Sequence, residues 1–407
     1  MSNPAEQNEV WITGVGLVSS LGADANEHAE RFFSGAPVVP VVDETRYAPY
    51  SVHPLTELDF SKQIPKKSDQ RQMELWQRIG VHAAGLALSD AGIAGHPDLL
   101  DQTHLVVAAG SGERDTKVDC EVLDKLGPRD DAALLAKEVL PSALRPTLFL
   151  AQLSNMLAGN ISIVHNVTGS SRTFMGEEMA GLAAMENAFR RIAASQADVV
   201  LVGGALNAER EDLLLGYEIG HNLWRGPVRP VWERRDDGGG FSPGSMGAFV
   251  VLESAAHAEA RGAKRYARLT AIETDRANRE PGEVMHTLLQ LLPRLNRESL
   301  AGPLLVLSGA SGAEPATKEE LVFLTRLAAR DRVVAARAYG SLLGHGVEAH
   351  FPMGVALAAL ALEHKASLPP SGPADIEGPL STPLEHVLVT GVGHWRGEGL
   401  ALVEAIQ

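Results

Sequence analysis

Two adjacent glutamates, Glu177 and Glu178, stand among small and apolar residues in the stretch TFMGEEMAGL at 173–182. The following letters, AAMENAFRRIAA, have the pattern of an amphipathic helix. A carboxylate at the start of a partly buried helix can accept the free backbone N–H groups, act as a general base, or stand where another residue once worked. As a base it needs a pKa raised by burial, whereas the helix dipole lowers it. The residues alone leave both directions open.

Other residue types that carry chemistry are few. The only cysteine, Cys120, lies in the polar stretch TKVDCEVLDKLG with no base nearby, so we expect it on an interface-side helix or loop and not as a nucleophile. No pair of histidines has metal-ligand spacing with a third ligand nearby, so the sequence predicts no metal. The stretch GVGLVSSLG fails the G-x-G-x-x-G spacing, and no phosphate-binding loop occurs. We therefore expect no cofactor.

The composition is that of an ordinary globular protein. The chain has 407 residues, of which 45% are hydrophobic and 21% charged, with a net charge of −15. Such an acidic surface repels phosphate backbones and anionic lipids, so we expect no nucleic acid and no membrane partner. No apolar run reaches the length of a membrane span, and the first residues lack the pattern of a secretory signal. The sequence therefore predicts a cytoplasmic protein.

Short apolar runs closed by glycine turns recur along the chain and have the form of buried strands, at 10–16, 104–112, 197–205, 304–312 and 386–393. Helical patterns alternate with them, at 72–92, 180–195 and 319–330. This alternation predicts an α/β fold with largely parallel sheets. The runs near 10 and 304 match in pattern and predict two similar halves, 1–255 and 256–407, joined through the charged, alanine-rich stretch at 253–266.

Several of these stretches resemble the β-ketoacyl-acyl-carrier-protein synthases of the thiolase superfamily. They are VWITGVGLVSSLGADANE, RQMELWQRIGVHAAGLALSDAGI, ADVVLVGGALNA, the segment from RPVWERRDDGGG to KRYARL, and GVGHWRGEGLALVEA. They cover essentially the whole chain in the family's order. The resemblance implies a thiolase-like five-layer fold, in which two similar βαβαβαββ halves are stacked and the protein is normally a dimer.

The family's catalytic residues do not carry over. Its enzymes use a cysteine at a helix N-terminus, two histidines and a lysine, with a phenylalanine that gates the acyl pocket. In register with the flanking motifs, the cysteine falls on Glu178 and the linker acid on Ser245. The histidines, the lysine and the gate fall on Ser311, Ser341, Ala336 and Val392. A carboxylate would form only an unstable anhydride with an acyl group, and no histidine is left to stabilise the enolate. The resemblance therefore implies no condensation by this chain alone.

The same stretch is similar to the chain-length factors, ketosynthase-like subunits in which a polar residue replaces the cysteine. In GEEMAGL, Glu177 matches their carboxylate and Glu178 replaces their amide. This implies a heterodimer with an active ketosynthase, which an acyl carrier protein meets mainly through that partner, in fatty-acid or polyketide elongation. The product could be an aromatic polyketide, a polyene or a very long acyl chain, and Val392 favours a long chain.

The segment NVTGSSRTF, just before the glutamates, is where family members pair strands across the dimer axis. The resemblance thus implies interface or tunnel positions, with an internal core strand as the alternative, for Ser170, Arg172, Thr173, Phe174 and Met175. His394 and Trp395 follow the C-terminal glycine turn and could fill or block the vacated pocket. His345 and His350 could reach it from beyond Ser341, but a surface or core position is more typical.

Two other functions of the chain stay open, and the setting of His165 and Asn166 is also predicted from the sequence. The chain could be an acyl-thioester hydrolase or decarboxylase with Glu178 as the base, or a non-catalytic homodimer that binds acyl groups. His165 and Asn166 have the setting of strand-end residues.

Overall fold

The computed structural model describes residues 8–126, 132–138, 140–143, 146–295, 300, 302–329, 334–372, 376–380 and 383–406. Its ten strands form one continuous sheet in the order β3-β2-β4-β5-β1-β6-β10-β9-β7-β8. They are β1 (Val10–Val18), β2 (His104–Ala109), β3 (Ser171–Met175), β4 (Val199–Leu206), β5 (Met246–Ser254), β6 (Ala267–Asp275), β7 (Leu304–Ser308), β8 (Val334–Ala338), β9 (His386–Val392) and β10 (Glu398–Glu404).

The strand order repeats itself. Strands β1 to β5 follow the order 3-2-4-5-1 from the β3 edge inward, and β6 to β10 follow the same order from the β8 edge inward. The first strand of each set, β1 and β6, meet as an antiparallel pair at the centre. Within each set the outer strands pair in parallel and the inner ones antiparallel. The domain boundary near residue 255 stays a prediction.

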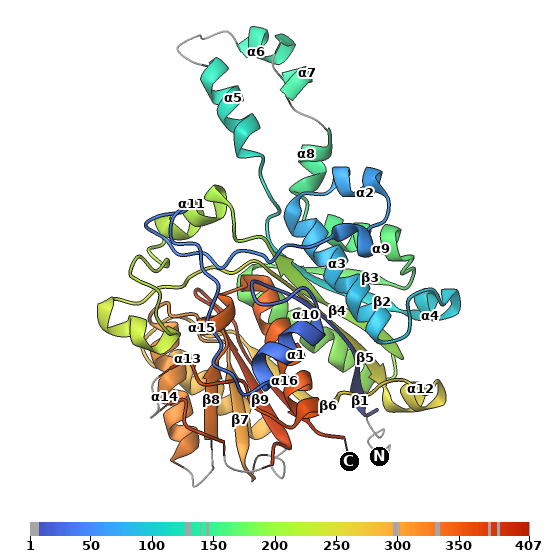
Figure 1. The fold of residues 1–407 in the computed structure, drawn as a ribbon, viewed down its shortest axis with the longest axis vertical. Helices are drawn as coiled ribbons and strands as arrows, with labels where there is room; N and C mark the ends of the chain where they lie inside the picture. Colours follow the sequence, from blue (N-terminus) through green and yellow to red (C-terminus); the bar gives the residue numbers. More distant parts are fainter. Residues whose placement is uncertain are drawn as a thin grey trace.

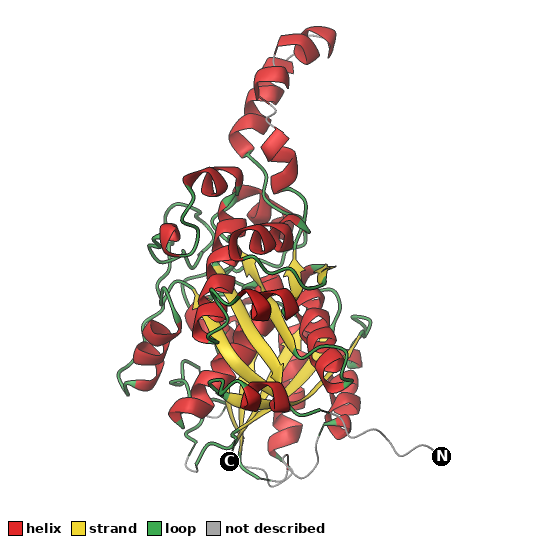
Figure 2. Ribbon diagram, turned by 90° about the vertical axis from the view of Figure 1, so that its right-hand side faces the viewer, coloured by secondary structure: helices red, strands yellow, loops and turns green. Residues whose placement is uncertain are grey.

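Helices cover and separate the two parts of the sheet (Figures 1 and 2). The helices used below are α3 (Leu75–Asp90), α9 (Met156–His165), α10 (Glu177–Ala193), α11 (Glu211–Ile219), α13 (Glu283–Leu291), α14 (Ala316–Ala328), α15 (Gly340–Leu343) and α16 (His350–His364). The remaining α-helices are α1 (Ala25–Phe33), α2 (Lys67–Gln72), α4 (Pro97–Gln102), α5 (Thr116–Leu126), α6 (Ala132–Glu138), α7 (Leu140–Ala143), α8 (Pro146–Ala151) and α12 (Ala255–Ala260).

Three apolar cores define five layers. One core joins α3 and α9 to the outer face of β1, β2, β4 and β5, and another joins α13 and α14 to β7, β8, β9 and β10. The central core contains α10 and α16, which lie between the two parts of the sheet. Helix α16 is apolar around its circumference, and its residues His350 to Leu362 are all buried, as a helix covered on both sides must be. The predicted thiolase-like five-layer fold is confirmed.

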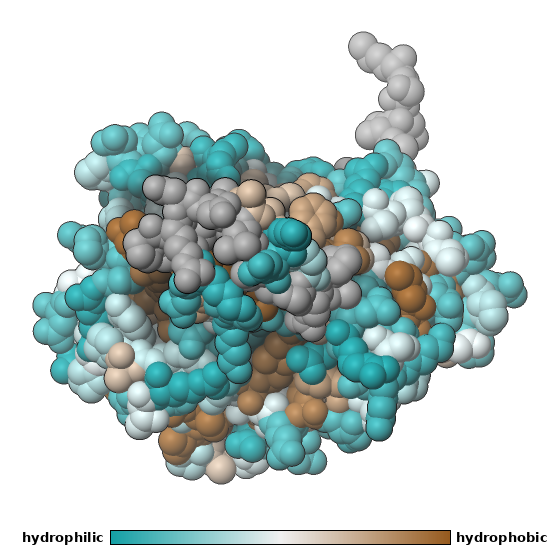
Figure 3. Space-filling model, turned by 90° about the horizontal axis from the view of Figure 1, so that it is seen from above, coloured by the Kyte–Doolittle hydropathy of each residue, from teal (hydrophilic) through white to brown (hydrophobic). Residues whose placement is uncertain are grey.

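Helices α5 to α8 extend from the body as a separate projection (Figure 1). It exposes apolar side chains, among them Leu123 and Phe149, which are 65% and 67% exposed. The face of the molecule that is seen from above has hydrophobic patches, drawn in brown, between mostly hydrophilic side chains (Figure 3). Cys120 is exposed on α5, away from the central helices.

The predicted strands and helices match the observed ones to within a few residues, but two predictions are wrong. The sheet is not largely parallel, because five of its nine described strand pairings are antiparallel and four are parallel. The other wrong prediction is local. His165 is the last residue of α9, and Asn166 is its left-handed C-cap at φ 57°, so neither ends a strand. The apolar ISIVH stretch has strand-like residues, but its packing against α3 makes it helical. No helix in the described part of the chain is long and apolar enough to cross a membrane.

Candidate functional site

The N-terminus of α10 carries the two glutamates on an unusual backbone. Gly176, the N-cap, has φ 115°, and Glu177 follows with φ 26°, a left-handed value that a residue with a Cβ rarely adopts. Such conformations cluster at functional sites, where the surrounding structure holds them in place. The turn directs Glu178 into the central layer, where it is 4% exposed. Glu177 remains partly accessible.

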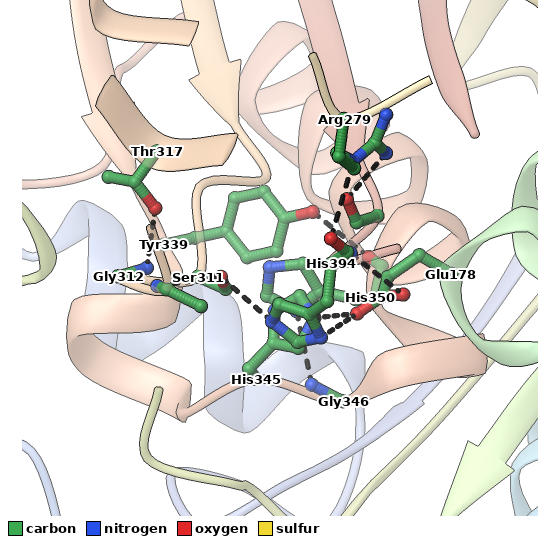
Figure 4. Close-up of polar contacts among 12 residues, drawn as sticks. Glu178, Arg279, Ser311, Gly312, Thr317, Tyr339, His345, Gly346, His350 and His394 are labelled. Atoms are coloured by element: carbon green, nitrogen blue, oxygen red, sulfur yellow. Dashed lines mark hydrogen bonds and ion pairs between the residues drawn. The ribbon is translucent and has the colours of Figure 1, made fainter. Parts of the chain in front are cut away.

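Two histidines from distant segments meet Glu178 in the protein interior (Figure 4). The Nε2 atom of His345 lies 3.0 Å from Oε1 of Glu178, and Nδ1 of His394 lies 2.7 Å from the same oxygen. The opposite ring nitrogen of His394, Nε2, is 3.0 Å from Oγ of Ser311. All four residues are at most 6% exposed. The site therefore holds a buried carboxylate between two imidazoles.

Backbone hydrogen bonds fix the two segments that carry these histidines. The amide of His345, just after α15, donates to the carbonyl of Ser242 at 2.8 Å. His394 lies in the turn between β9 and β10, which closes with a 2.8 Å bond from the amide of Gly393 to the carbonyl of Gly397. The guanidinium of Arg279 donates to the carbonyls of Gly393 and His394 at 2.7 and 3.3 Å. Both imidazoles are thus held on ordered backbone.

Aromatic packing fixes the imidazole planes. The ring of Phe241 stacks on His394 at a centroid distance of 4.6 Å and meets the edge of His345 at 5.5 Å. On the other side, His350 packs against His345 at 4.0 Å and stacks on Tyr339 at 4.4 Å. Nδ1 of His350 accepts the Gly346 amide at 3.2 Å, and the ring does not contact Glu178 through a hydrogen bond. His350 is therefore a neighbour of the site.

The electrostatics of the site favour an ionised Glu178. Burial by itself raises the pKa of this carboxyl, but the charge of His394 and the hydrogen bond from His345 together hold it well below its ordinary value. Burial lowers the pKa of His345, against the opposing hydrogen bond to Glu178. Burial also lowers the pKa of His350 well below its usual range. A carboxylate with so low a pKa is a weak proton acceptor.

The order Ser311, His394, Glu178 is that of a serine-hydrolase relay, in which a carboxylate orients the histidine that activates a hydroxyl. Two observations weigh against that chemistry. Within the described residues, Nδ1 of His394 has no hydrogen bond of suitable direction, despite its short contact with Glu178. Ser311 is 3% exposed, and it is absent from the described walls of the cavity nearby.

That cavity, of about 550 Å³, opens beside the start of α10. Glu177 and Met175 form part of its wall, together with Tyr217 of α11, Glu348 and Trp395. Trp395 is 46% exposed and stacks on Tyr217 at 5.5 Å, so that it narrows the cavity without filling the cluster behind it. Burial raises the pKa of Glu348 to about 7, and the charges of Glu178 and Glu177 add to this effect.

The positions of the family's other catalytic residues have structural partners. Ser341 accepts the amide of Val231 at 2.9 Å, and Ser245 accepts the amide of Ala208 at 3.0 Å. Ala336 and Val392 are each 3% exposed and pack in the core formed with α13 and α14. Val392 is not among the described cavity residues, so the inference of a wide pocket from this residue has no support in the observed walls.

The interface residues predicted from the sequence lie at an edge of the sheet. Strand β3 pairs with β2 and, in the described part of the chain, has no strand on its other side. Ser171 and Arg172 are exposed, Thr173 and Phe174 are half-buried, and Met175 is 68% exposed. Ser170 precedes the strand and its hydroxyl is near Nδ1 of His104. The alternative of an internal core strand is wrong, whereas the dimer contact stays a prediction.

The sequence suggests His394 as a residue that could fill the vacated pocket, and in the structure its Nδ1 atom lies 2.7 Å from Glu178. The sequence favours a surface or core position for His345, which is buried and forms a hydrogen bond with Glu178. Loss of histidine at Ser311 and Ser341 therefore does not remove imidazoles from the site. The prediction of no metal rested on sequence spacing, but the fold brings Glu178, His345 and His394 together from three distant segments. One feature of the sequence could have predicted this contact. His345 lies four residues, about one helical turn, after Ser341, the position that the resemblance assigns to a family histidine.

Comparison with known proteins identifies relatives by sequence. Residues 7–258 match the family described as "Beta-ketoacyl synthase, N-terminal domain". The 3-oxoacyl-[acyl-carrier-protein] synthase 2 of Vibrio harveyi is 26% identical over 271 residues, which are 65% of this chain and 62% of that protein. The enzyme of the same name from Rhizobium meliloti is 28% identical over 275 residues, with 64% and 62% covered. The matches thus span less than two thirds of these relatives.

Solved structures share the fold over nearly the whole chain. The structure named "The ishigamide ketosynthase/chain length factor" superposes with a TM-score of 0.79 at 19% identity, and covers 98% of this chain and 100% of its own. A β-ketoacyl synthase from Burkholderia phymatum gives a TM-score of 0.77 at 18% identity, with 98% and 100% covered. At these identities the likeness establishes the fold.

Proposed function

This chain belongs to the β-ketoacyl synthase family, and from that premise we propose that it is a member without condensing activity of its own. In this proposal it acts as a chain-length-factor-type subunit. It pairs with an active β-ketoacyl-acyl-carrier-protein synthase in fatty-acid or polyketide elongation.

One observation carries the proposal, namely that Glu178, which the resemblance assigns to the nucleophile position, is a buried carboxylate in contact with two histidines. A thiolate at a helix N-terminus attacks a thioester, and the resulting acyl-cysteine persists until the next step. A carboxylate would form an anhydride that water destroys. One nitrogen of His345 and one of His394 lie within 3.0 Å of the Oε1 atom of Glu178, so this oxygen is already in contact with two side chains. The only cysteine, Cys120, is exposed on α5.

The open edge of β3 supports a partner. Its exposed backbone and side chains leave room for one more strand, and edge strands of this kind readily pair with another chain. The similar structure named as a ketosynthase and chain length factor provides a precedent for two such chains in one assembly. Another similar structure, AntDE:AntF, is named as an acyl carrier protein in complex with its ketosynthase. For this acidic chain, carrier docking would fall mainly to the partner.

The cavity beside Glu177 supports a role in shaping the acyl tunnel. It lies next to Met175 at the end of β3, so a partner on that edge would adjoin it. The elongated chain would be an aromatic polyketide, a polyene or a very long acyl group, and the described walls do not choose among them.

The low pKa of Glu178 weakens the hydrolase alternative, because a general base must take a proton from water and a carboxylate of low pKa is a weak proton acceptor. A homodimer that binds acyl groups would use the same β3 edge. The proposed heterodimer and this homodimer can be distinguished by experiment. The chain is co-expressed with a synthase that retains its cysteine and histidines, and the complexes are weighed by native mass spectrometry. We expect a 1:1 heterodimer that elongates an acyl chain on a carrier protein.

Matched variants identify which chain does the chemistry. Replacement of the partner's cysteine with alanine should abolish product, whereas Cys120→Ala in this chain should leave turnover within about twofold. If this chain forms only homodimers under every mixing and co-expression condition, the proposal is contradicted. Thioester hydrolysis by the isolated chain that Glu178→Gln removes would favour the hydrolase.

A further inference from the structure

We propose that Glu178, His345 and His394 bind a divalent transition-metal ion of the Zn²⁺ class. Their donor atoms all lie within 4.8 Å of one another, and all three side chains are buried. Two imidazoles and one carboxylate form a ligand set that zinc uses in proteins. The three residues come from the start of α10, the segment after α15 and the β9–β10 turn. An ion there would join three separate parts of the fold.

The direction of the His394 ring is the strongest evidence. Its Nδ1 lies 2.7 Å from Oε1 of Glu178, yet among the described residues this buried nitrogen has no hydrogen bond of acceptable direction. In a simple imidazole–carboxylate pair, the N–H bond points at the oxygen. Donor atoms that converge on one ion approach each other without pointing at each other. The contact between His394 and Glu178 has the second geometry.

The other nitrogen of His394 supplies the support that a metal ligand needs. Its Nε2 is 3.0 Å from Oγ of Ser311, so an Nε2–H donates to that hydroxyl and leaves the Nδ1 lone pair free for an ion. Histidine ligands usually bind a polar group through their second nitrogen, which fixes the tautomer and the ring plane. The stacked ring of Phe241 restricts His394 further.

The charges are also suitable. A metal ion needs an ionised carboxylate and neutral imidazoles. Glu178 supplies the carboxylate oxygen, and His345 and His394 each supply one imidazole nitrogen. The buried guanidinium of Arg234 and the positive end of α10 oppose a cation, whereas Glu177 adds negative potential on the cavity side. Direct ligation by a carboxylate outweighs these longer-range repulsions.

The required movement is small. Bonds of about 2.1 Å at a tetrahedral ion separate neighbouring donor atoms by about 3.4 Å. The observed distances from Oε1 of Glu178 to the two imidazole nitrogens are 3.0 and 2.7 Å. A small rotation of the glutamate side chain lengthens these two contacts toward this spacing, and the three donor atoms already lie within 4.8 Å of one another. Three protein ligands leave one position for water.

The test uses the full-length protein, metal-free after chelation and then titrated with Zn²⁺ or Co²⁺ alone. We expect about one ion per chain by elemental analysis, a higher Tm with Zn²⁺, and the visible ligand-field bands of four-coordinate Co²⁺. Glu178→Gln, His345→Gln and His394→Gln should each weaken binding by about tenfold or more. The matched control His350→Gln changes the neighbouring buried ring and should retain the ion.

Three results would overturn the metal site. The first is less than about a tenth of an ion per chain after reconstitution, with no change in Tm. The second is equal binding by the wild type and by a variant that carries all three substitutions, which would place the ion on surface side chains. If the variants fail to fold, the wild-type protein alone still tests the site. The third contrary result is therefore a Co²⁺ form of the wild-type protein without visible ligand-field bands. None of these readouts depends on a partner synthase, so they are separate from the test of the proposed function.

Discussion

The two edge strands of the sheet, β3 and β8, occupy the same place in the repeated strand order but face different surroundings. The side chains of β3 are exposed or half-buried. On β8, Ala335 to Ala338 are at most 3% exposed. A buried carboxylate, Glu377, covers this second edge and accepts the amide of Ala338 at 2.9 Å. The same topology thus ends in one edge free for a partner and one closed by its own chain.

Each edge strand also leads directly into a segment that carries the site. Strand β3 runs into α10, where Glu178 is ionised. Strand β8 runs into α15 and on to His345 and Glu348, where burial raises the pKa of the second carboxyl to about 7. The open edge is thus continuous in sequence with the segment that carries Glu178. This continuity is why we assign the partner to the β3 side.

Substitution of Glu377, which binds the edge of β8, should have the largest effect on the free energy of unfolding. Glu377 is 2% exposed and also accepts the Ser371 amide at 2.7 Å and the Trp232 indole N–H at 3.0 Å. Glu377→Ala leaves these buried donors without an acceptor and should cost about 3 kcal/mol or more in urea unfolding. On the open edge, Arg172→Ala should change stability by less than about 0.5 kcal/mol. Equal losses would show that the two edges do not differ.

Proline can separate the two sides of β3 itself. The amide of Leu105 on β2 donates to the carbonyl of Ser170, so the parallel pattern directs the N–H of Arg172 toward β2 and that of Thr173 outward. Arg172→Pro should destabilise the subunit by about 2–3 kcal/mol, whereas Thr173→Pro should cost about 1 kcal/mol. Thr173→Pro should nevertheless prevent dimerisation, measured by analytical ultracentrifugation. Full dimer formation by Thr173→Pro would place the partner elsewhere.

The difference between the two carboxylates predicts opposite pH dependences. The folded state holds a proton on Glu348 that the unfolded chain releases, so the free energy of unfolding falls as the pH rises from about 4.5 through about 7. Glu348→Gln removes this loss, and its stability relative to wild type should rise by about 2–3 kcal/mol between pH 5 and 8. The lowered pKa of Glu178 acts at lower pH, where protonation removes its contribution. Parallel urea-unfolding profiles of the two proteins would contradict the assignment for Glu348.

Trp395 should give the smallest effect on stability. Its ring is 46% exposed and stacks on Tyr217, so Trp395→Ala should cost about 1 kcal/mol or less. The same change widens the cavity that adjoins the open edge, and binding of a fluorescent fatty-acid probe should strengthen severalfold. Unchanged probe affinity would show that Trp395 does not limit the cavity.

The sequence predicts the fold well because its signals are local. The five apolar runs with glycine turns each form a strand, and the helix predicted at 180–195 is α10. The proposed replacement of the family's histidines by Ser311 and Ser341 also comes from the sequence, because each serine lies in register with a motif. The cluster is not readable, because Glu178, His345 and His394 meet only through the layering of the sheet and α16. The helix that ends at His165 was missed because its β-branched residues favour strand locally, and packing against α3 decides otherwise.

The most direct test of the account is acyl elongation by the complex of this chain with an active synthase. We predict that the wild-type complex makes product and that the isolated chain makes none. Alanine at the partner's cysteine should reduce product to background, even though Glu178 is intact. Product from this variant complex, or from the isolated chain, would contradict the claim that the chain supplies no nucleophile.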